Sequence, residues 1–147
     1  MAAHHCRLSE AAATAMCNTL ADLVDAGTPP GFIKIFTGAE PTHCNDAAGT
    51  EVAACTLNTT AFSAATYQAG THTSDVTLVT SATDPHAAGH ANAVTYFRIV
   101  NAAGTAILQG TCSATAGDDL VLNSAIIATN SQVEITALTI SVPIDQA

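Results

Sequence analysis

The chain has 147 residues, enough for one domain with its own core and short for two. Only 10% of the residues are charged and 4% are aromatic, and the formal net charge is −9. Contacts with nucleic-acid phosphates need clustered cations, but the three Lys and Arg residues are far apart, so direct nucleic-acid binding is not expected. No apolar run approaches a membrane span or a signal peptide, so no membrane contact and no ordinary export are expected.

The N-terminal part predicts an arm followed by a helix. We expect residues 1–7 to form a flexible arm and residues 8–147 to form a single domain that begins with a helix at about residues 9–26. Ser9 can cap the start of this helix, and Gly27 can close its end. Met16, Leu20 and Leu23 recur at three- and four-residue spacing, so we expect them to pack on a sheet.

From residue 32 onward the sequence predicts strands. Short Thr-rich and β-branched stretches alternate with Gly, Asn, Asp and Pro, and residues 94–100 and 105–112 flank the turn "NAAG" as the clearest hairpin. This pattern predicts a mainly β fold, an antiparallel β-sandwich (jelly-roll or immunoglobulin-like) of about seven or eight strands with one N-terminal α-helix. The loops 38–50 and 81–93 are long and polar, which is typical of loops with a function or a partner. The residues expected in the core are Phe32 or Phe36, Phe97, Ile99, Ile107, Ile135 and Ile140.

Metal binding and catalysis are not favoured by the pattern of chemically active residues. No two cysteines lie within ten residues of each other, and His86 and His90 lie in a loop, so a structural zinc site is not expected. The pairs His43-Cys44 and His5-Cys6 are neighbours in sequence only, and few cations are present to stabilise a thiolate. Asp118-Asp119 fits a turn before a strand. We therefore expect no enzyme activity, no metal and no cofactor.

The five cysteines favour cross-linking instead. Cys44 and Cys55 flank a loop, and a bond between them would contribute roughly 2–3 kcal/mol on a loop-entropy argument. Cys17 could stay a buried free thiol or pair with Cys112. Cys6, on the expected arm, is the first candidate for a disulfide to another chain. Cys44 and Cys112 are the other intermolecular candidates, provided that the fold exposes them.

Arg98 and Tyr96 are the candidate interface residues. They share one face of the strand 94–100, opposite Phe97 and Ile99. Two interpretations stay open for Arg98. It could be an exposed guanidinium lying over the Tyr96 ring, or it could form an ion pair with an acidic neighbour at a subunit contact.

The order of segments resembles a family of small tailed-bacteriophage structural proteins. A helix precedes "GFIKIFTGAEP", followed by "CTLNTTAFSAA", "AVTYFRIVNAAGTAILQGTCS" and "DLVLNSAIIATNSQVEITALTISVP". These match a "tG-x-x-P" segment, a "tyFRI…G…i-qG" hairpin and a terminal "i-x-i-t-s-l-t-i" strand. The resemblance covers most of the chain after residue 8 and carries no catalytic residues, and the cysteines are not part of it.

This resemblance implies a virion component, a capsid decoration, cement or linking protein that is made in the host cytoplasm and released on lysis. Its partners would be the major capsid protein or other virion structural proteins, and it would be oligomeric in the particle. The low charge and the odd cysteine count agree with a shell protein reinforced by disulfides. A tail or neck protein, and a carbohydrate-binding β-sandwich module, stay open as alternatives. Sugar sites usually stack their ligands on exposed aromatic rings, which are scarce here.

Overall fold

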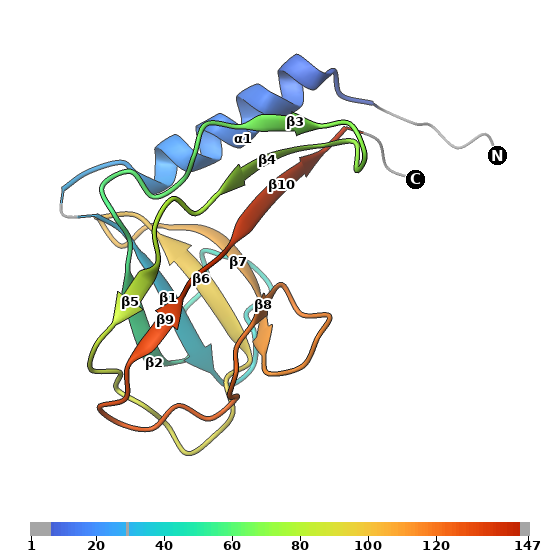
Figure 1. Ribbon diagram of the computed structural model, residues 1–147. Coiled ribbons are helices and arrows are strands. Elements are labelled where there is room, and N and C mark those ends of the chain that lie inside the picture. The colour runs from blue at the N-terminus through green and yellow to red at the C-terminus, as the bar shows by residue number, and fades with distance from the viewer. Residues whose placement is uncertain (1–6, 29, 145–147) are drawn as a thin grey trace.

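The structure is a computed structural model that describes residues 7–28 and 30–144. It confirms a mainly β, sandwich-like fold with one N-terminal helix. Figure 1 shows two parts: a large curled sheet, and a smaller sheet covered by the helix α1 (Glu10–Val24). Residues 1–6 of the expected arm, including Cys6, lie outside the described residues.

The described part of the chain contains ten strands, where seven or eight were expected, because several have only two or three residues. Their bounds are β1 (Phe32–Thr37), β2 (Thr50–Thr56), β3 (Thr66–Gln68), β4 (Thr73–Thr77), β5 (Ala82–Asp84), β6 (Tyr96–Val100), β7 (Ala106–Ser113), β8 (Leu120–Val121), β9 (Val133–Ile135) and β10 (Thr139–Pro143).

The large sheet has the order β8-β7-β6-β1-β2-β5-β9, and the small sheet has the order β10-β4-β3. All pairings are antiparallel except the short parallel pair β7–β8.

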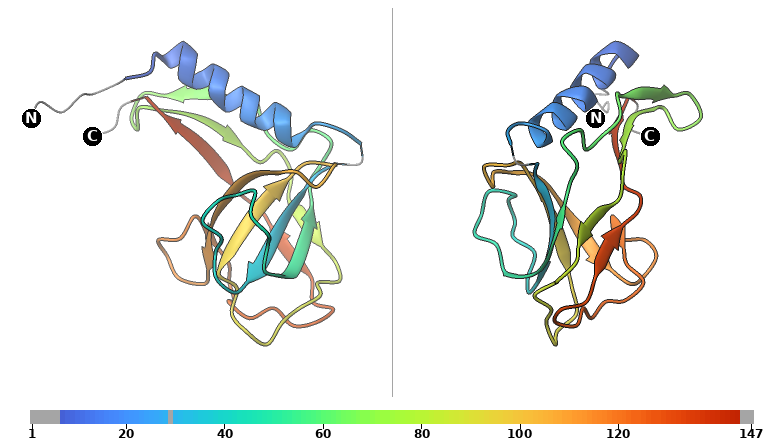
Figure 2. Two further views of the ribbon diagram at one scale, coloured as in Figure 1. Left: turned by 180° about the vertical axis from the view of Figure 1, so that it is seen from behind. Right: turned by 60° about the vertical axis from the view of Figure 1, so that its left-hand side comes forward.

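Residues 131–144, expected as one stretch of strand, divide into β9 in the large sheet and β10 in the small sheet. Figure 2 shows β4–β5 and β9–β10 running between the two parts. The two edges of the large sheet, β8 and β9, are joined by the loop 122–132 and do not pair.

The helix begins as predicted, because the Ser9 hydroxyl accepts a hydrogen bond from the Ala12 amide at 3.1 Å. Its buried face differs from the prediction. Met16 and Leu23 are about half exposed, and the helix packs through small residues instead. Small side chains allow a close approach to β4 and β10, as the 3.5 Å contact from the Cys17 thiol to the Ile140 carbonyl shows. The buried positions are Ala13, Cys17, Ala21 and Val24.

The main core lies inside the curl of the large sheet. Ile33, Cys55 and Ile99 occupy paired positions on three neighbouring strands and are fully buried there. The expected core residues Phe36, Phe97, Ile99, Ile135 and Ile140 are buried, while Phe32 and Ile107 are half-buried. The opposite, outer face of the same strands carries Lys34 and Arg98, which pair in register.

Candidate functional site

The loop between β1 and β2, residues 38–49, folds back over the outer face of the large sheet; we call it the strap loop. Its backbone is tied to side chains that rise from β6 and β7 underneath. The Gly49 amide donates to the Tyr96 hydroxyl at 2.6 Å. The Gln109 side-chain amide donates to the Pro41 carbonyl at 2.8 Å and to a Glu40 carboxylate oxygen at 3.0 Å. The strap loop is therefore a structured cover.

Arg98 is at the centre of the contact between the strap loop and the sheet. Its Nε donates to Gln109 Oε1 at 2.8 Å, and its Nη1 donates to the Asp46 carbonyl at 2.8 Å. The guanidinium lies 5.8 Å from the centre of the Tyr96 ring, which itself stacks on Phe36. Nη2 is buried and has no hydrogen-bond partner among the described residues. The charge is stabilised by carbonyl dipoles and an aromatic face rather than by a carboxylate.

Both candidate interface residues are therefore inside the molecule. Tyr96 has 0% and Arg98 has 5% of its surface exposed. The expected stacking of Arg98 over Tyr96 is present, but the expected exposure is wrong because the strap loop covers both side chains. Sequence reasoning placed them on one face of the strand and missed the cover, since their partners in the strap loop lie about fifty residues earlier in the chain.

The four described cysteines are free thiols. The expected Cys44–Cys55 bond is not formed, because Cys55 points into the core whereas Cys44 lies in the strap loop on the outer face. Of the two interpretations of Cys17, the structure agrees with a buried free thiol and not with a bond to Cys112, because Cys17 faces the small sheet while Cys112 lies on β7 next to β8. Cys112 is 1% exposed and so does not meet the condition set for an intermolecular link.

Burial sets the chemistry of these thiols. It raises the pKa of Cys55 and of Cys112 to about 12, and the nearby Asp84 and Asp118 add to the respective shifts. Burial also raises the pKa of Cys17, and it raises the pKa of half-buried Cys44 against an opposing effect of Arg98. The three buried thiols, Cys17, Cys55 and Cys112, are thus held in the unreactive protonated form at neutral pH.

The remaining candidate groups have structural contacts. Asp119 accepts hydrogen bonds from the amide and hydroxyl of Thr111 at 2.8 and 2.9 Å, and Asp118 accepts one from Ser113, which fits the predicted turn. His90 Nδ1 accepts from the Asn92 amide at 3.0 Å. Across residues 7–28 and 30–144, no group of three or more His, Cys, Asp or Glu side chains is arranged to hold a metal ion.

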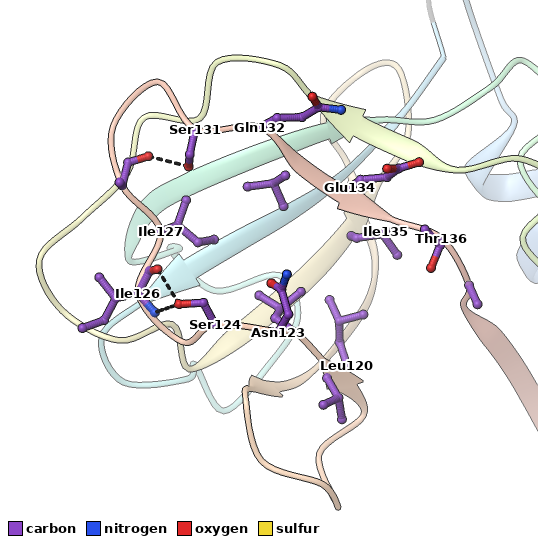
Figure 3. Close-up of a pocket in the computed structure, with 15 residues that line it drawn as sticks. Leu120, Asn123, Ser124, Ile126, Ile127, Ser131, Gln132, Glu134, Ile135 and Thr136 are labelled. Carbon is purple, nitrogen blue, oxygen red and sulfur yellow. Dashed lines mark hydrogen bonds between the residues drawn. The ribbon is translucent and has the colours of Figure 1, made fainter.

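A pocket of about 800 Å³ opens at the seam of the large sheet, between the edge strands β8 and β9. We call it the seam pocket. It is lined by residues between 120 and 137, and Figure 3 shows Leu120 and Ile135 on opposite sides of it, with Ile127 reaching in from the loop 122–132. Sequence reasoning missed this pocket, because nothing in the alternation of residues indicates that the sheet curls without closing.

The outer wall of the seam pocket is the seam loop, residues 122–132, which is fixed to the neighbouring loop around residues 87–94. The amides of Val94 and His90 donate to the carbonyls of Ala125 and Ile127 at 2.8 and 2.9 Å. Ala87 exchanges two further backbone bonds with Asn130 and Ser131. These bonds hold the seam loop away from the two strand edges and keep the pocket open.

The surface has little positive charge of its own. Lys34 forms an exposed ion pair with Glu51 at 2.8 Å, and Arg98 is buried under the strap loop. Carboxylates such as Glu10, Asp22 and Glu134 are exposed. Within the described residues, no helix has the length and apolarity needed to cross a bilayer.

Comparison with protein-family models, with curated proteins and with solved structures finds no match.

Proposed function

We propose that this protein is a structural component of a bacteriophage particle, a decoration or linking protein that stabilises the shell through contacts with the major capsid protein or other virion proteins. The proposal starts from the resemblance in the strap and hairpin segments. The structure adds one observation in its support: these segments, far apart in sequence, form one hydrogen-bonded unit.

The unit joins the "tG-x-x-P" segment to both strands of the resembling hairpin. Gln109, from "ILQG", accepts from Arg98 of "YFRI" and donates to Pro41 of "TGAEP". Thr95, at the start of the hairpin segment, donates its hydroxyl hydrogen to the Gly38 carbonyl at 2.6 Å. These hydrogen bonds bring the resembling segments together in one small β domain with a covered outer face, and this contact between them supports the proposal.

Charge agrees with this role. An acidic chain whose cations at residues 34 and 98 are engaged within the molecule suits docking onto a basic or neutral partner surface, and it is repelled by nucleic acid. The carbohydrate-binding alternative gains no comparable support. None of the described residues that line the seam pocket is aromatic, and Phe32 and Tyr67, the two Phe and Tyr side chains that are not fully buried, are half-buried.

The direct test is to purify intact particles from a lysate of the bacterium that carries the gene and to quantify this chain in them. We expect it to sediment with the particles at a copy number comparable with that of the shell subunit. A copy number far below that of the shell subunit would indicate a neck or tail ring. Absence from washed particles would overturn the proposal.

Covalent reinforcement is tested separately, on the same particles. With Cys17, Cys55 and Cys112 buried, Cys6 and Cys44 are the residues that can link to a second chain in an oxidising medium. We expect a larger species on a non-reducing gel that collapses to 14.8 kDa on reduction. It should disappear in Cys6→Ser and persist in Cys44→Ser. A free monomer without reductant would leave a decoration protein held by non-covalent contacts alone.

A further inference from the structure

The guanidinium of Arg98 has one nitrogen whose hydrogen-bonding capacity the fold leaves unused. Nε donates to Gln109 and Nη1 donates to the Asp46 carbonyl, both at 2.8 Å, whereas Nη2 is buried and has no partner among the described residues. A buried donor without an acceptor destabilises a fold, and the effect is larger when the group is charged. This end of Arg98 therefore favours an oxygen acceptor placed beside it, and an anionic oxygen most of all.

Cys44 lies in the turn of the strap loop that is bound to this guanidinium. The turn is closed by two hydrogen bonds, from the Asp46 amide to the His43 carbonyl at 3.0 Å and from the His43 amide to an Asp46 carboxylate oxygen at 3.1 Å. The carbonyl of the same Asp46 accepts from Arg98 Nη1. Arg98 is also the charged group that acts on the thiol, since it lowers the pKa of Cys44 against the effect of burial. The thiol is therefore within electrostatic reach of the guanidinium that has the unused donor.

Cys44 differs from the other described cysteines in its access to solvent. It is half-buried, whereas Cys17, Cys55 and Cys112 are buried. It forms no disulfide with any of them, and Cys55 points into the core on the other side of the sheet. A sulfenic acid persists where no second thiol condenses with it. Within the described fold, a singly oxidised Cys44 has no such thiol beside it.

We propose that Cys44 is a site of oxidative modification, at which hydrogen peroxide converts the thiol to a sulfenate whose oxygen accepts a hydrogen bond from Arg98 Nη2. The thiolate sulfur attacks one oxygen of the peroxide, so that the O–O bond breaks and an S–O bond forms. The sulfur gives two electrons to the peroxide, whose second oxygen leaves as hydroxide. The hydroxide takes the proton of the new S–OH group to become water, and the sulfenate remains. Thiol reductants reverse this step.

The added oxygen supplies the acceptor that the thiol does not. A cysteine sulfur is a weak acceptor, and in the reduced protein it forms no hydrogen bond with Nη2. An oxygen on the sulfur extends the side chain and carries negative charge, and a guanidinium binds an anionic oxygen more strongly than a neutral one. The strap loop is then joined to Arg98 through Cys44 as well as through Asp46, so we expect it to open less often.

Burial slows this reaction without weakening its product. It keeps the pKa of Cys44 above the ordinary value, so the thiolate is a minor species at neutral pH and the modification proceeds slowly there. The product is stabilised by the guanidinium, which no described carboxylate pairs with. The inference goes beyond the proposed function, because the modification forms on the purified chain without any particle.

The test uses the full chain with Cys6→Ser, so that the four described cysteines are its only thiols. The chain is treated with hydrogen peroxide and then with dimedone, a 1,3-dione that attaches to sulfenic acids, and the labelled residues are identified by peptide mass spectrometry. We expect at least tenfold more label at Cys44 than at any of the other three cysteines. No oxidation of Cys44, or equal label at all four cysteines, would overturn the proposal.

A matched pair of variants tests the bond to Arg98. Hydrogen exchange at the Asp46 amide is compared before and after oxidation, without dimedone, and we expect oxidation to slow it severalfold in the Cys6→Ser chain. Arg98→Lys keeps the positive charge but has a single nitrogen in place of the fork, so this slowing should be lost. Lys34→Ala removes the cation that pairs with Arg98 in register, and the slowing should remain. Equal slowing in both variants, or none in the Cys6→Ser chain, would contradict a bond between the sulfenate and Nη2.

Discussion

The strap loop and the seam loop have similar lengths, yet one is closed onto the large sheet and the other stands away from it. Under the strap loop lie long polar side chains, Tyr96, Arg98 and Gln109, which take up its backbone groups. Behind the seam loop lie apolar side chains such as Leu120 and Ile135 that offer it no hydrogen bonds, and another loop binds its carbonyls instead. The side chains beneath a loop, more than its own composition, decide whether it covers a face or frames an opening.

Of the changes considered, removal of the guanidinium under the strap loop is expected to destabilise the contact between the strap loop and the sheet most. Arg98→Ala loses two hydrogen bonds from a charged donor and leaves the Asp46 carbonyl and Gln109 Oε1 without their partner. We expect the free energy of unfolding to fall by about 3 kcal/mol, measured by urea denaturation. Lys34→Ala is the matched control, since Lys34 pairs with Arg98 in register but forms an exposed ion pair worth about 0.5 kcal/mol. Equal effects of the two variants would show that the strap loop is not held by Arg98.

A second effect comes from the two thiols that lie behind the edges of the seam. Cys112 pairs with Leu120 of β8, and the Cys55 thiol points to the Val133 carbonyl of β9. Both have a pKa of about 12 in the fold against an ordinary value of 9.0, so the unfolded chain loses these protons first. Stability should be constant below about pH 8 and fall above about pH 9, by about 1.4 kcal/mol per pH unit for each thiol.

Urea denaturation between about pH 8 and pH 10 measures this slope. A Cys55→Ala/Cys112→Ala double variant serves as the control, because it keeps every other titrating group and should lose the part of the slope that the thiols contribute. The same slope in the double variant would show that Cys55 and Cys112 do not have the raised pKa values described here.

A smaller change loosens one end of the strap loop. Tyr96→Phe removes the hydroxyl that accepts from the Gly49 amide and leaves a part-buried donor unpaired. We expect a loss of about 1–2 kcal/mol and faster hydrogen exchange at the Gly49 amide. Tyr67→Phe, on β3 of the small sheet, is the control for loss of a tyrosine hydroxyl elsewhere. Unchanged exchange at Gly49 would contradict the anchoring role of Tyr96.

The smallest effect is expected at the rim of the seam pocket. Ile126→Ala should change stability by less than about 0.5 kcal/mol, since the side chain is already exposed. Ile127→Ala, one residue further along the same loop and 6% exposed, should cost about 2–4 kcal/mol. Comparison of the two variants by thermal denaturation shows whether the side chain of Ile126 is exposed at the rim or packed like that of Ile127. A large loss for Ile126→Ala would show that the seam pocket is more closed than described.

The sequence predicted the local features of this fold and missed those that depend on distant partners. The Ser9 cap, the hairpin of β6 and β7 and the burial of Phe97 and Ile99 follow from neighbours a few residues apart. The helix face was misjudged, because Met16 and Leu23 are more apolar than Ala13 and Cys17, whereas close packing on the small sheet favours small side chains. The network of Arg98 joins segments about fifty residues apart, and the seam depends on the curl of the whole sheet. Neither the Arg98 network nor the seam can be recognised from residues that are close together in the sequence.

The proposed role in the particle is tested most directly by adding the protein back to particles made without it. Particles from a phage deleted for this gene are mixed with increasing amounts of the purified full chain, and the bound protein is quantified after sedimentation. A decoration or linking protein should bind saturably, with one copy per repeated site on the shell, and should raise the temperature at which the particles release their nucleic acid. If the chain does not bind and the deleted particles are as heat-resistant as complete ones, the proposed role is wrong.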